Sequence, residues 1–398
     1  MINLKKILFW VCCFLLIAGL IFCYVKRSAI KKLVKSIISP TISAQTLDEF
    51  VDRSPPEKTV FLFELNNYHH ECIPGYTKYF TDLGYNVDIV VIKDSQDCMI
   101  KFKPQNKVKI FTFDSEDDLM ANSEKIRSKL EKYDYIFLNS TDSDDIYPGR
   151  ADKYEQLGIL NNEKTIFVGH DLGGVNAIKK VLPEETFSRN RVITLSKFDI
   201  GNFVNPHYFG DFNRKEKNET TKFFLTSTGD GRKYDTFIKA MQNLKNEGLD
   251  FKVIVTGRSD VLSEKDLPEE LATHFEFQKG VSYEKLYSLV QECDYIILPC
   301  DPDSDDLNTF RTRRASGSTQ LMYGFLKPMI VVKELADLIE LDSENAHICY
   351  KNEVTEIANT LKKAINSTKN EYKTMQSNLE RLQKRIYDES LENFKKAL

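Results

Sequence analysis

Short runs of β-branched and aromatic residues alternate with longer amphipathic stretches from about residue 59 onward. In the first half of the chain these runs predict strands at residues 60–65, 87–92, 108–113, 135–139, 165–168 and 192–195. The stretches between them have helical periodicity, as in residues 115–132. Strands that alternate with helices are typical of parallel sheets with crossover connections, so the pattern predicts an α/β fold.

A second set of runs follows a segment rich in Gly, Asn, Pro and charges. This segment, residues 206–222, is predicted to be an interdomain hinge. Later strands are expected at residues 223–226, 251–255, 275–277, 295–298, 329–332 and 348–350. We therefore predict two Rossmann-like doubly wound domains, 58–205 and 223–366, facing across a cleft, with C-terminal helices in 367–398 capping the second domain.

The N-terminus contains an apolar segment, residues 7–25, that no charge interrupts. At about 1.5 Å per residue it is long enough to cross a hydrocarbon core of about 30 Å. We predict a single-pass membrane anchor in residues 1–25. A cleaved signal peptide is the alternative, although the segment ends in large residues before Lys26 and Arg27 and not in a small-residue cleavage site.

Residues 26–57 are predicted to form a basic amphipathic juxtamembrane segment and a linker. More cations follow the apolar segment than precede it, which predicts that the large C-terminal part lies on the cytoplasmic side. The lysines fall on one helical face and Ile30, Leu33 and Ile37 on the other, as in helices that lie on anionic membranes. A solvated juxtamembrane stub is the alternative interpretation.

Charge and cysteine content exclude several classes of protein. The formal charge is −4, with 55 basic and 59 acidic residues, so no basic field predicts a nucleic-acid partner. Five of the eight cysteines lie beyond the apolar segment, without a C-x-x-C pair, which indicates reduced thiols and no zinc site. The acidic run at 301–306 fits no Ca²⁺ loop and is interpreted as a solvated turn, so no metal is expected.

Two predicted helix starts in the second domain could bind a diphosphate. The loop after the strand at 223–226 contains Gly229, Arg232 and Lys233 and leads into a helix. The second start is Ser316-Gly317-Ser318, after a loop with Arg311, Arg313 and Arg314. Free backbone N–H groups and the helix dipole favour an anion at such positions. A purely structural turn, or a serine that only caps its helix, is the alternative for each.

The first domain has its sharpest polar cluster in Gly169-His170-Asp171-Leu172-Gly173-Gly174, after a predicted strand. His170 and Asp171 are the candidate catalytic residues. His69, His70 and Gly75, after the first predicted strand, are further candidates for lining the cleft, with a plain loop as the alternative for the two histidines. The same Gly-x-Asp-x-Gly pattern also fits the nucleophile elbow of an α/β-hydrolase that uses Asp171, although no oxyanion loop precedes it.

The second half resembles the donor-binding domain of GT-B glycosyltransferases, in the order and spacing of several segments. These are the run from Phe223 to Ala240, Val253 to Arg258, Gln278 to Leu286, and Ser316-Gly317-Ser318 through Pro328. The resemblance implies that Arg232, Lys233 and the Ser-Gly-Ser turn, with Gly229, bind the donor diphosphate. It places Gly257, Arg258 and Gly280 near the nucleotide, and implies a metal-independent enzyme without a cofactor. It also implies that His170 and Asp171 face the cleft toward the sugar or the acceptor, and that His69, His70 and Gly75 lie on the acceptor side.

The sequence departs from the common family pattern at two places. Arg313 and Leu321 stand where many relatives carry paired glutamates, and Leu326 replaces the glycine of the turn before Lys327-Pro328. We expect transfer of a hexose-type sugar from a UDP- or GDP-linked donor to a membrane-associated glycan or lipid-linked acceptor in cell-envelope polysaccharide synthesis. A hydrolase using Asp171, a nucleotide-sugar epimerase and a non-catalytic GT-B-like scaffold remain the alternatives.

Overall fold

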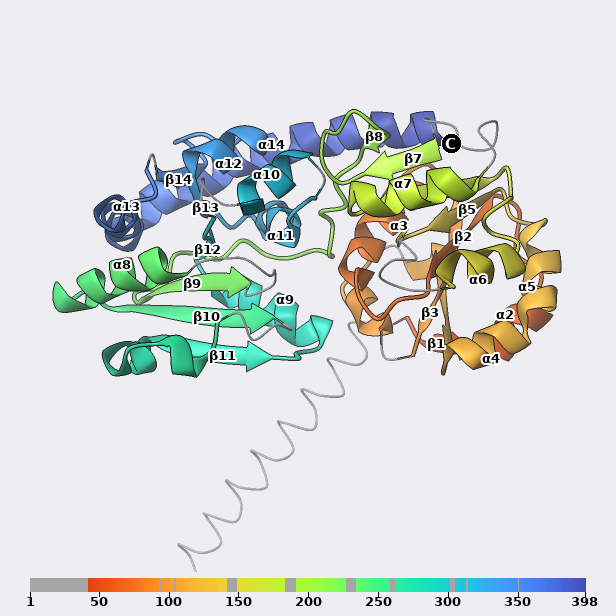
Figure 1. The fold of residues 1–398 in the computed structure, drawn as a ribbon, viewed down its shortest axis with the longest axis horizontal. Coiled ribbons are helices and arrows are strands. Elements are labelled where there is room, and N and C mark those ends of the chain that lie inside the picture. Colours follow the sequence, from red (N-terminus) through yellow and green to blue (C-terminus); the bar gives the residue numbers. More distant parts are fainter. Residues whose placement is uncertain are drawn as a thin grey trace, which may run out of the picture. The chain divides into compact units, whose positions relative to one another are not determined.

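The computed structural model describes residues 42–93, 95–103, 105–141, 149–182, 191–226, 234–257, 262–300, 305–312, 314–349 and 351–398 (Figure 1). Residues 44–398 form one compact unit. The predicted anchor and most of the basic segment fall in residues 1–41, outside the described ranges. Among the helices of the described ranges, none combines the length and the apolar character that a membrane crossing needs.

The first domain is built on a parallel sheet with strand order β1-β4-β3-β2-β5-β6-β7-β8. Its strands are β1 (Ala44–Thr46), β2 (Thr59–Glu64), β3 (Asn86–Ile92), β4 (Val108–Phe113), β5 (Tyr135–Leu138), β6 (Thr165–Gly169), β7 (Val192–Thr194) and β8 (Asn202–Phe203). Its helices are α2 (Leu47–Asp52), η1 (His70–Cys72), α3 (Ile73–Asp82), η2 (Gln96–Met99), η3 (Gln105–Lys107), α4 (Glu116–Ala121), α5 (Ser123–Leu130), α6 (Arg150–Gln156) and α7 (Leu172–Val181). The strand order reverses between β2 and β5, and ligands of such sheets bind at this switch point.

The second domain has a six-stranded parallel sheet with order β11-β10-β9-β12-β13-β14. Its strands are β9 (Thr221–Thr226), β10 (Phe251–Gly257), β11 (Phe275–Lys279), β12 (Tyr295–Leu298), β13 (Met329–Val332) and β14 (Ala346–Cys349). Its helices are α8 (Asp235–Asn246), η5 (Glu264–Asp266), η6 (Glu269–His274), α9 (Tyr283–Glu292), α10 (Asp305–Thr312), α11 (Gly317–Phe325), α12 (Lys333–Leu338), α13 (Val354–Asn366) and α14 (Lys369–Ala397). Here the order reverses between β9 and β12.

The buried strand residues explain why the sheets form. In β2 every residue is buried, as expected for a central parallel strand covered on both faces. Phe61 and Phe63 of β2 pack with Phe50, Phe111 and Tyr133 on one face. The five cysteines beyond residue 41 are free and buried, as the sequence indicated.

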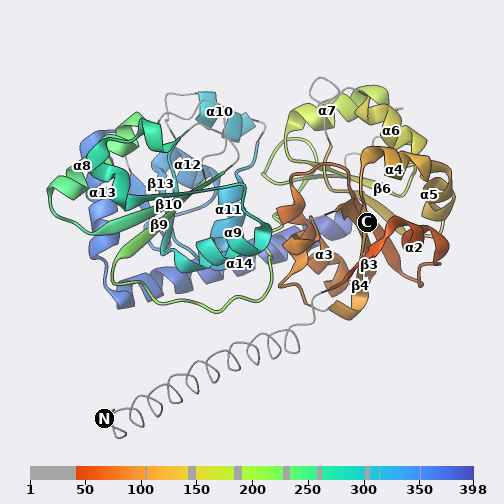
Figure 2. The same cartoon turned by 90° about the horizontal axis from the view of Figure 1, so that it is seen from below.

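The long helix α14 belongs to both domains (Figure 2). Its Tyr372 stacks edge-on against Tyr295 of β12, at 5.3 Å between ring centroids. Near its other end, Phe394 packs against Phe80 of α3 (4.7 Å) and Phe137 of β5 (5.9 Å). The C-terminal helices were expected to cap the second domain, and α14 does so but also packs on the first domain. Helical periodicity reveals an apolar face but not its partners.

The first domain begins earlier than predicted. Residues 44–52, expected to be part of a linker, form β1 and α2. β1 pairs with β4, and Phe50 of α2 is buried. Thr46 and Glu49 form a capping box that starts α2. The predicted helix at 115–132 is likewise two helices, α4 and α5, separated at Asn122.

Candidate functional site

A contact between two hydroxyls joins the end of β9 to the start of α11. Thr226, the last residue of β9, has its Oγ1 2.8 Å from Oγ of Ser318, a buried residue in the first turn of α11. The loop with Gly229, Arg232 and Lys233 begins at residue 227, directly after Thr226. These three residues lie outside the described ranges, but the strand that delivers their loop ends beside α11.

The first turn of α11 has no side-chain cap. Ser316 occupies the N-cap position with extended backbone angles, yet its hydroxyl accepts no hydrogen bond from the turn. By contrast, Ser282 caps α9 by accepting from the backbone N–H of Lys285 at 3.3 Å. The alternative interpretation, that Ser316 only caps its helix, therefore finds no support. The N–H of Thr319 donates to the Ser316 carbonyl at 3.0 Å, whereas those of Gly317 and Ser318 make no hydrogen bond to a described residue, which suits an anion.

Gly317, the first residue of α11, stands exposed at this opening. A Cβ added to it would meet only the side-chain amide of Gln320, at 4.0 Å. The backbone is thus open to close approach by a ligand. The side-chain amide nitrogen of Gln320 donates to the carbonyl oxygens of Ser316 (2.7 Å) and Gly317 (3.2 Å), which fixes the shape of the turn.

The two described residues predicted to lie near the nucleotide share one edge of the second sheet. Gly257 ends β10 with φ +150°, and Gly280 follows β11 with φ +61°. Gly257 pairs with Lys279, the residue before Gly280, and β10 lies next to β9. Both conformations favour glycine, and no atom lies within 4 Å of a Cβ added at Gly280. Arg258 lies outside the described ranges.

In the first domain, His69 and His170 come together although 101 positions separate them in the sequence. Their rings stack with centroids 3.8 Å apart and an interplanar angle of 15°. His69 adopts a left-handed backbone conformation (φ +64°) just after β2, and His170 directly follows β6. Burial and the neighbouring His69 lower the pKa of His170 to about 3, so this imidazole is neutral at pH 7.

Asp171 contacts the second domain. Its Oδ2 accepts a hydrogen bond from Nε of Arg314 at 2.8 Å, and the two residues also form an isolated antiparallel bridge. Its Oδ1 accepts from the backbone N–H of Gly173 at 2.7 Å. Because Arg314 lies two positions before Ser316, this ion pair brings the predicted catalytic loop to the approach of α11.

The other acceptor-side candidates are buried. His70 has no exposed surface, and its ring lies 6.3 Å from that of Tyr283. Gly75 packs against the backbone of Pro206, where an added Cβ would lie 2.5 Å from the carbonyl carbon. In this conformation both residues are buried, His70 near Tyr283 of the second domain, and His69 is the one of the three that lies beside His170.

A second set of contacts between the domains lies at the start of α9. The Asp97 carboxylate accepts a hydrogen bond from the backbone N–H of Tyr283 at 2.7 Å, and the Tyr283 hydroxyl donates to Glu71 at 3.1 Å. Burial raises the pKa of Glu71, but the hydrogen bond and charge of His69 outweigh it and bring it down to about 2. Glu71 is therefore ionised beside the stacked histidines.

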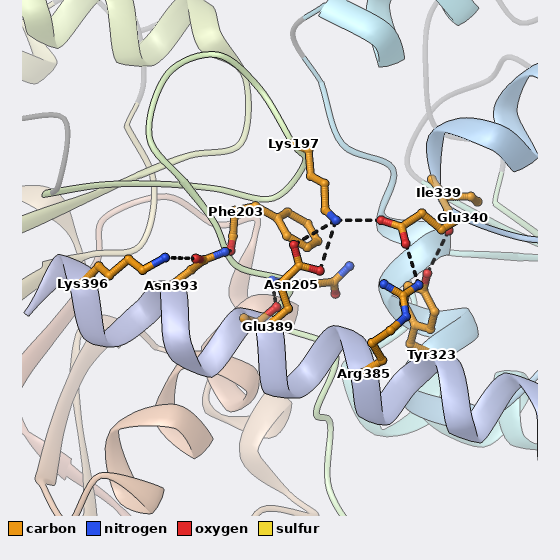
Figure 3. A network of polar contacts seen from close by, with 11 residues as sticks. Lys197, Phe203, Asn205, Tyr323, Ile339, Glu340, Arg385, Glu389, Asn393 and Lys396 are labelled. Carbon is orange, nitrogen blue, oxygen red and sulfur yellow. Dashed lines mark hydrogen bonds and ion pairs between the residues drawn. The ribbon is translucent and has the colours of Figure 1, made fainter.

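A pocket lined by both domains adjoins Arg314 and Ser316. At its wall, Nζ of Lys197 lies 2.7 Å from Glu340 and 2.8 Å from Glu389 of α14, and Arg385 pairs with Glu340 at 2.5 Å (Figure 3). These charges neutralise one another and join the loop after β7, the loop after α12 and α14. Arg311 and Arg314 also line the pocket, and their guanidinium groups add positive charge.

Sequence reasoning missed the carboxylate of Glu64. A single acidic residue ends the otherwise apolar run Val60-Phe61-Leu62-Phe63. A charged residue in a fully buried strand requires partners, so this pattern was a usable signal.

No protein-family model matches the chain, and no curated protein sequence does. Among solved structures, a glycosyltransferase from Rickettsia africae ESF-5 is 12% identical and aligns over 86% of this chain and 98% of its own, with a TM-score of 0.53. Anabaena Alr3699/HepE, solved in complex with UDP-glucose, is 14% identical over 85% of this chain and 98% of its own (TM-score 0.48). The MnaA protein of S. aureus, solved with UDP, is 11% identical over 80% and 90% (TM-score 0.42). The likeness to the Rickettsia africae protein is one of fold, and the two parallel sheets of this chain are consistent with the expected pair of Rossmann-like domains of the GT-B type.

Proposed function

We propose that this chain is a glycosyltransferase that moves a hexose-type sugar from a UDP- or GDP-linked donor to an acceptor. One observation carries the proposal: the Asp171–Arg314 ion pair brings the loop after β6 to the approach of the uncapped helix α11. The residues proposed to bind the diphosphate and those proposed to contact the sugar therefore lie on neighbouring segments, which supports the proposal. The solved protein from Rickettsia africae with the same fold is itself a glycosyltransferase.

The donor diphosphate would bind at the opening of α11. The N–H groups of Gly317 and Ser318 and the positive end of the helix dipole favour its oxygens. Arg232 and Lys233, on the loop that begins after Thr226, would add two cations. Such groups stabilise the charge that develops on a departing diphosphate without a metal ion. Gly257, Arg258 and Gly280 would contact the nucleoside.

The sugar and the acceptor would lie against the first domain, beside His170 and Asp171. A neutral His170 can hydrogen-bond a hydroxyl without carrying charge into the site. Asp171 would align the two domains through Arg314 as they close over the donor. His69 would complete this wall through its stacking on His170.

The acceptor we propose is a membrane-associated glycan or a lipid-linked sugar in cell-envelope polysaccharide synthesis. The apolar segment at residues 7–25 and the basic stretch after it motivate this class, because they would hold the chain beside a bilayer. In this proposal the anchor is retained and the two domains lie on the cytoplasmic side.

The hydrolase alternative finds less support. Both carboxylate oxygens of Asp171 already accept hydrogen bonds, from Gly173 and Arg314. The two late histidines considered as its base, His274 and His347, lie at the amino ends of β11 and β14. Asp171 instead contacts Arg314, at the approach to α11, so neither histidine is placed to serve it as a general base.

A donor screen on the full-length chain in detergent tests the proposal. Thermal unfolding would be followed with UDP, GDP and CMP sugars, and nucleotide release would then be measured with and without acceptor extracts. We expect protection by one donor class and acceptor-dependent release. Turnover without acceptor would indicate an epimerase, binding without release a scaffold, and ester hydrolysis lost in Asp171→Asn a hydrolase. Truncation at residue 57 would remove β1 and α2 and is unsuitable.

A further inference from the structure

The Glu64 carboxylate is completely buried at the carboxyl end of β2, next to the switch point of the first sheet. Four donors converge on it. Oε1 accepts from the backbone N–H (2.8 Å) and the side-chain amide (2.9 Å) of Asn66. Oε2 accepts from the Asn139 amide (2.7 Å) and the Ser140 hydroxyl (2.5 Å). A buried charge with this many donors has a fixed position.

Asn139 connects this carboxylate to both stacked histidines. The residue directly follows β5, on the other side of the switch point. Its side-chain amide donates to Glu64 and also to the carbonyl oxygen of His69 at 3.1 Å. Its own carbonyl oxygen lies 2.8 Å from Nε2 of His170. A single residue thus holds the backbone of one histidine and the ring of the other.

The contact to the Asn139 carbonyl determines where the His170 proton lies. A backbone carbonyl only accepts hydrogen bonds, so Nε2 must carry the hydrogen. In a neutral imidazole the other nitrogen, Nδ1, then has a free lone pair. Nδ1 makes no hydrogen bond to any residue in the described ranges. Among the described residues, His69, the N-cap of η1, and Glu71 of η1 act on the charge of His170.

We propose that Glu64 and Asn139 are positioning residues that hold His170 with its hydrogen on Nε2, so that Nδ1 accepts a hydrogen bond from a substrate hydroxyl. The nature of that hydroxyl, on a sugar or an acceptor, rests on the proposed function. The tautomer and its dependence on Glu64 do not. The carboxylate holds the Asn139 side-chain amide, which also bonds the backbone carbonyl of His69, and the backbone carbonyl of the same Asn139 bonds the His170 ring.

The proposal distinguishes this network from an ordinary buried ion site in the same domain. Asp88 on β3 is also a buried carboxylate, bound by Arg53 and by the Tyr133 hydroxyl at 2.7 Å each. Neither partner contacts His69 or His170. Asp88→Asn is therefore the matched control for Glu64→Gln, since both change a buried carboxylate to an amide. A difference in stability between Asp88→Asn and Glu64→Gln does not affect the comparison, because the test reads the tautomer of His170.

The direct test is nuclear magnetic resonance of the full-length chain with ¹⁵N-labelled histidine rings. The chain has six histidines, and His170→Gln assigns the signal of interest. We expect the wild type and Asp88→Asn to show His170 with hydrogen on Nε2. Glu64→Gln and Asn139→Ala should convert it to a mixture of tautomers. Hydrogen on Nδ1 in the wild type, or an unchanged ring in both variants, would overturn the proposal.

A milder variant keeps the test usable if Glu64→Gln does not fold. Ser140→Ala removes one of the four donors to the carboxylate and leaves the other three. It should shift the His170 ring signals in the same direction by a smaller amount, and identical signals would count against the network.

Kinetics give a second readout that a merely structural role would not produce. Because the proposed diphosphate site lies on the other domain, Asn139→Ala should leave nucleotide affinity within about twofold of the wild type, while sugar transfer falls about 100-fold. An equal loss of nucleotide affinity and of sugar transfer in Asn139→Ala would argue against a positioning role for Asn139. If no donor binds the wild type, the proposed function fails, and the ring spectra still decide the positioning claim.

Discussion

The hydroxyl oxygens of Thr226 and Ser318 lie 2.8 Å apart, so the carboxyl end of β9 and the first turn of α11 are held together. β9 is one of the two strands at the switch point of the second sheet. An anion at the opening of α11 is therefore close to the start of the loop with Arg232 and Lys233. The account of the donor site depends on this contact.

Thr226→Val should lower the free energy of unfolding by about 1–3 kcal/mol. Valine keeps the shape of the strand residue but leaves the buried Ser318 hydroxyl without this partner. Denaturant unfolding measures the change. Thr112→Val is the control, because Thr112 is also a half-buried strand residue but makes only a long contact, 3.4 Å, to the Gln45 carbonyl. Equal effects of the two substitutions would contradict the role of the contact.

Asp171→Asn should reduce sugar transfer by about tenfold or more and change stability by less than about 1 kcal/mol. The pair with Arg314 is partly exposed, so water screens it, whereas the alignment that it gives is needed only when the domains act together. Asp114→Asn breaks an exposed ion pair with Lys93 and should affect neither quantity. If Asp171→Asn transfers sugar as fast as the wild type, the Asp171–Arg314 ion pair has no role in the reaction.

Stability should fall as the pH drops below about 6.5. Burial lowers the pKa of His207 and of His347 to about 4, from 6.5 in the unfolded chain. Between these values the unfolded chain binds protons that the folded chain does not, so the stability contribution is complete above pH 6.5 and is lost toward pH 4. By pH 5 the titration of each histidine should have lowered the free energy of unfolding by about 2 kcal/mol relative to its value at neutral pH.

Denaturant unfolding between pH 7 and pH 5 measures this effect. The slope of unfolding free energy against pH measures how many protons the chain takes up when it unfolds. In a variant with both His207→Gln and His347→Gln, this uptake should decrease by up to about two protons. The absolute stability of the variant does not enter the comparison. A slope equal to that of the wild type would show that these two rings do not titrate as described.

The sequence predicted twelve of the fourteen described strands because their apolar runs were continuous and flanked by polar turns, as in residues 108–113. It missed β1 and β8, because Ala44–Thr46 and Asn202–Phe203 form no apolar run. It also placed the start of the first domain too late, since α2 is a single short helix in a polar context.

At the candidate site, the sequence identified residue types but not their distances. His69 and His170 were separate candidates, and only the folded sheet stacks their rings. His70, next to His69, was considered equivalent, yet the turn at η1 buries it. Asn139 appeared as an ordinary strand end, because its importance lies in contacts with residues 75 positions before and 31 positions after it.

Calorimetric titration of a nucleoside diphosphate sugar into the wild-type chain and into Gly317→Ala tests the central claim, that the donor diphosphate binds at the opening of α11. Alanine fits the helix without a clash and should leave stability equal or higher by less than about 1 kcal/mol. We predict saturable binding of a UDP- or GDP-linked sugar to the wild type and a loss of affinity of about tenfold or more in Gly317→Ala, because a methyl group would stand where the phosphate approaches. No binding of any such donor to the wild type, or equal affinity in the two proteins, would contradict the account.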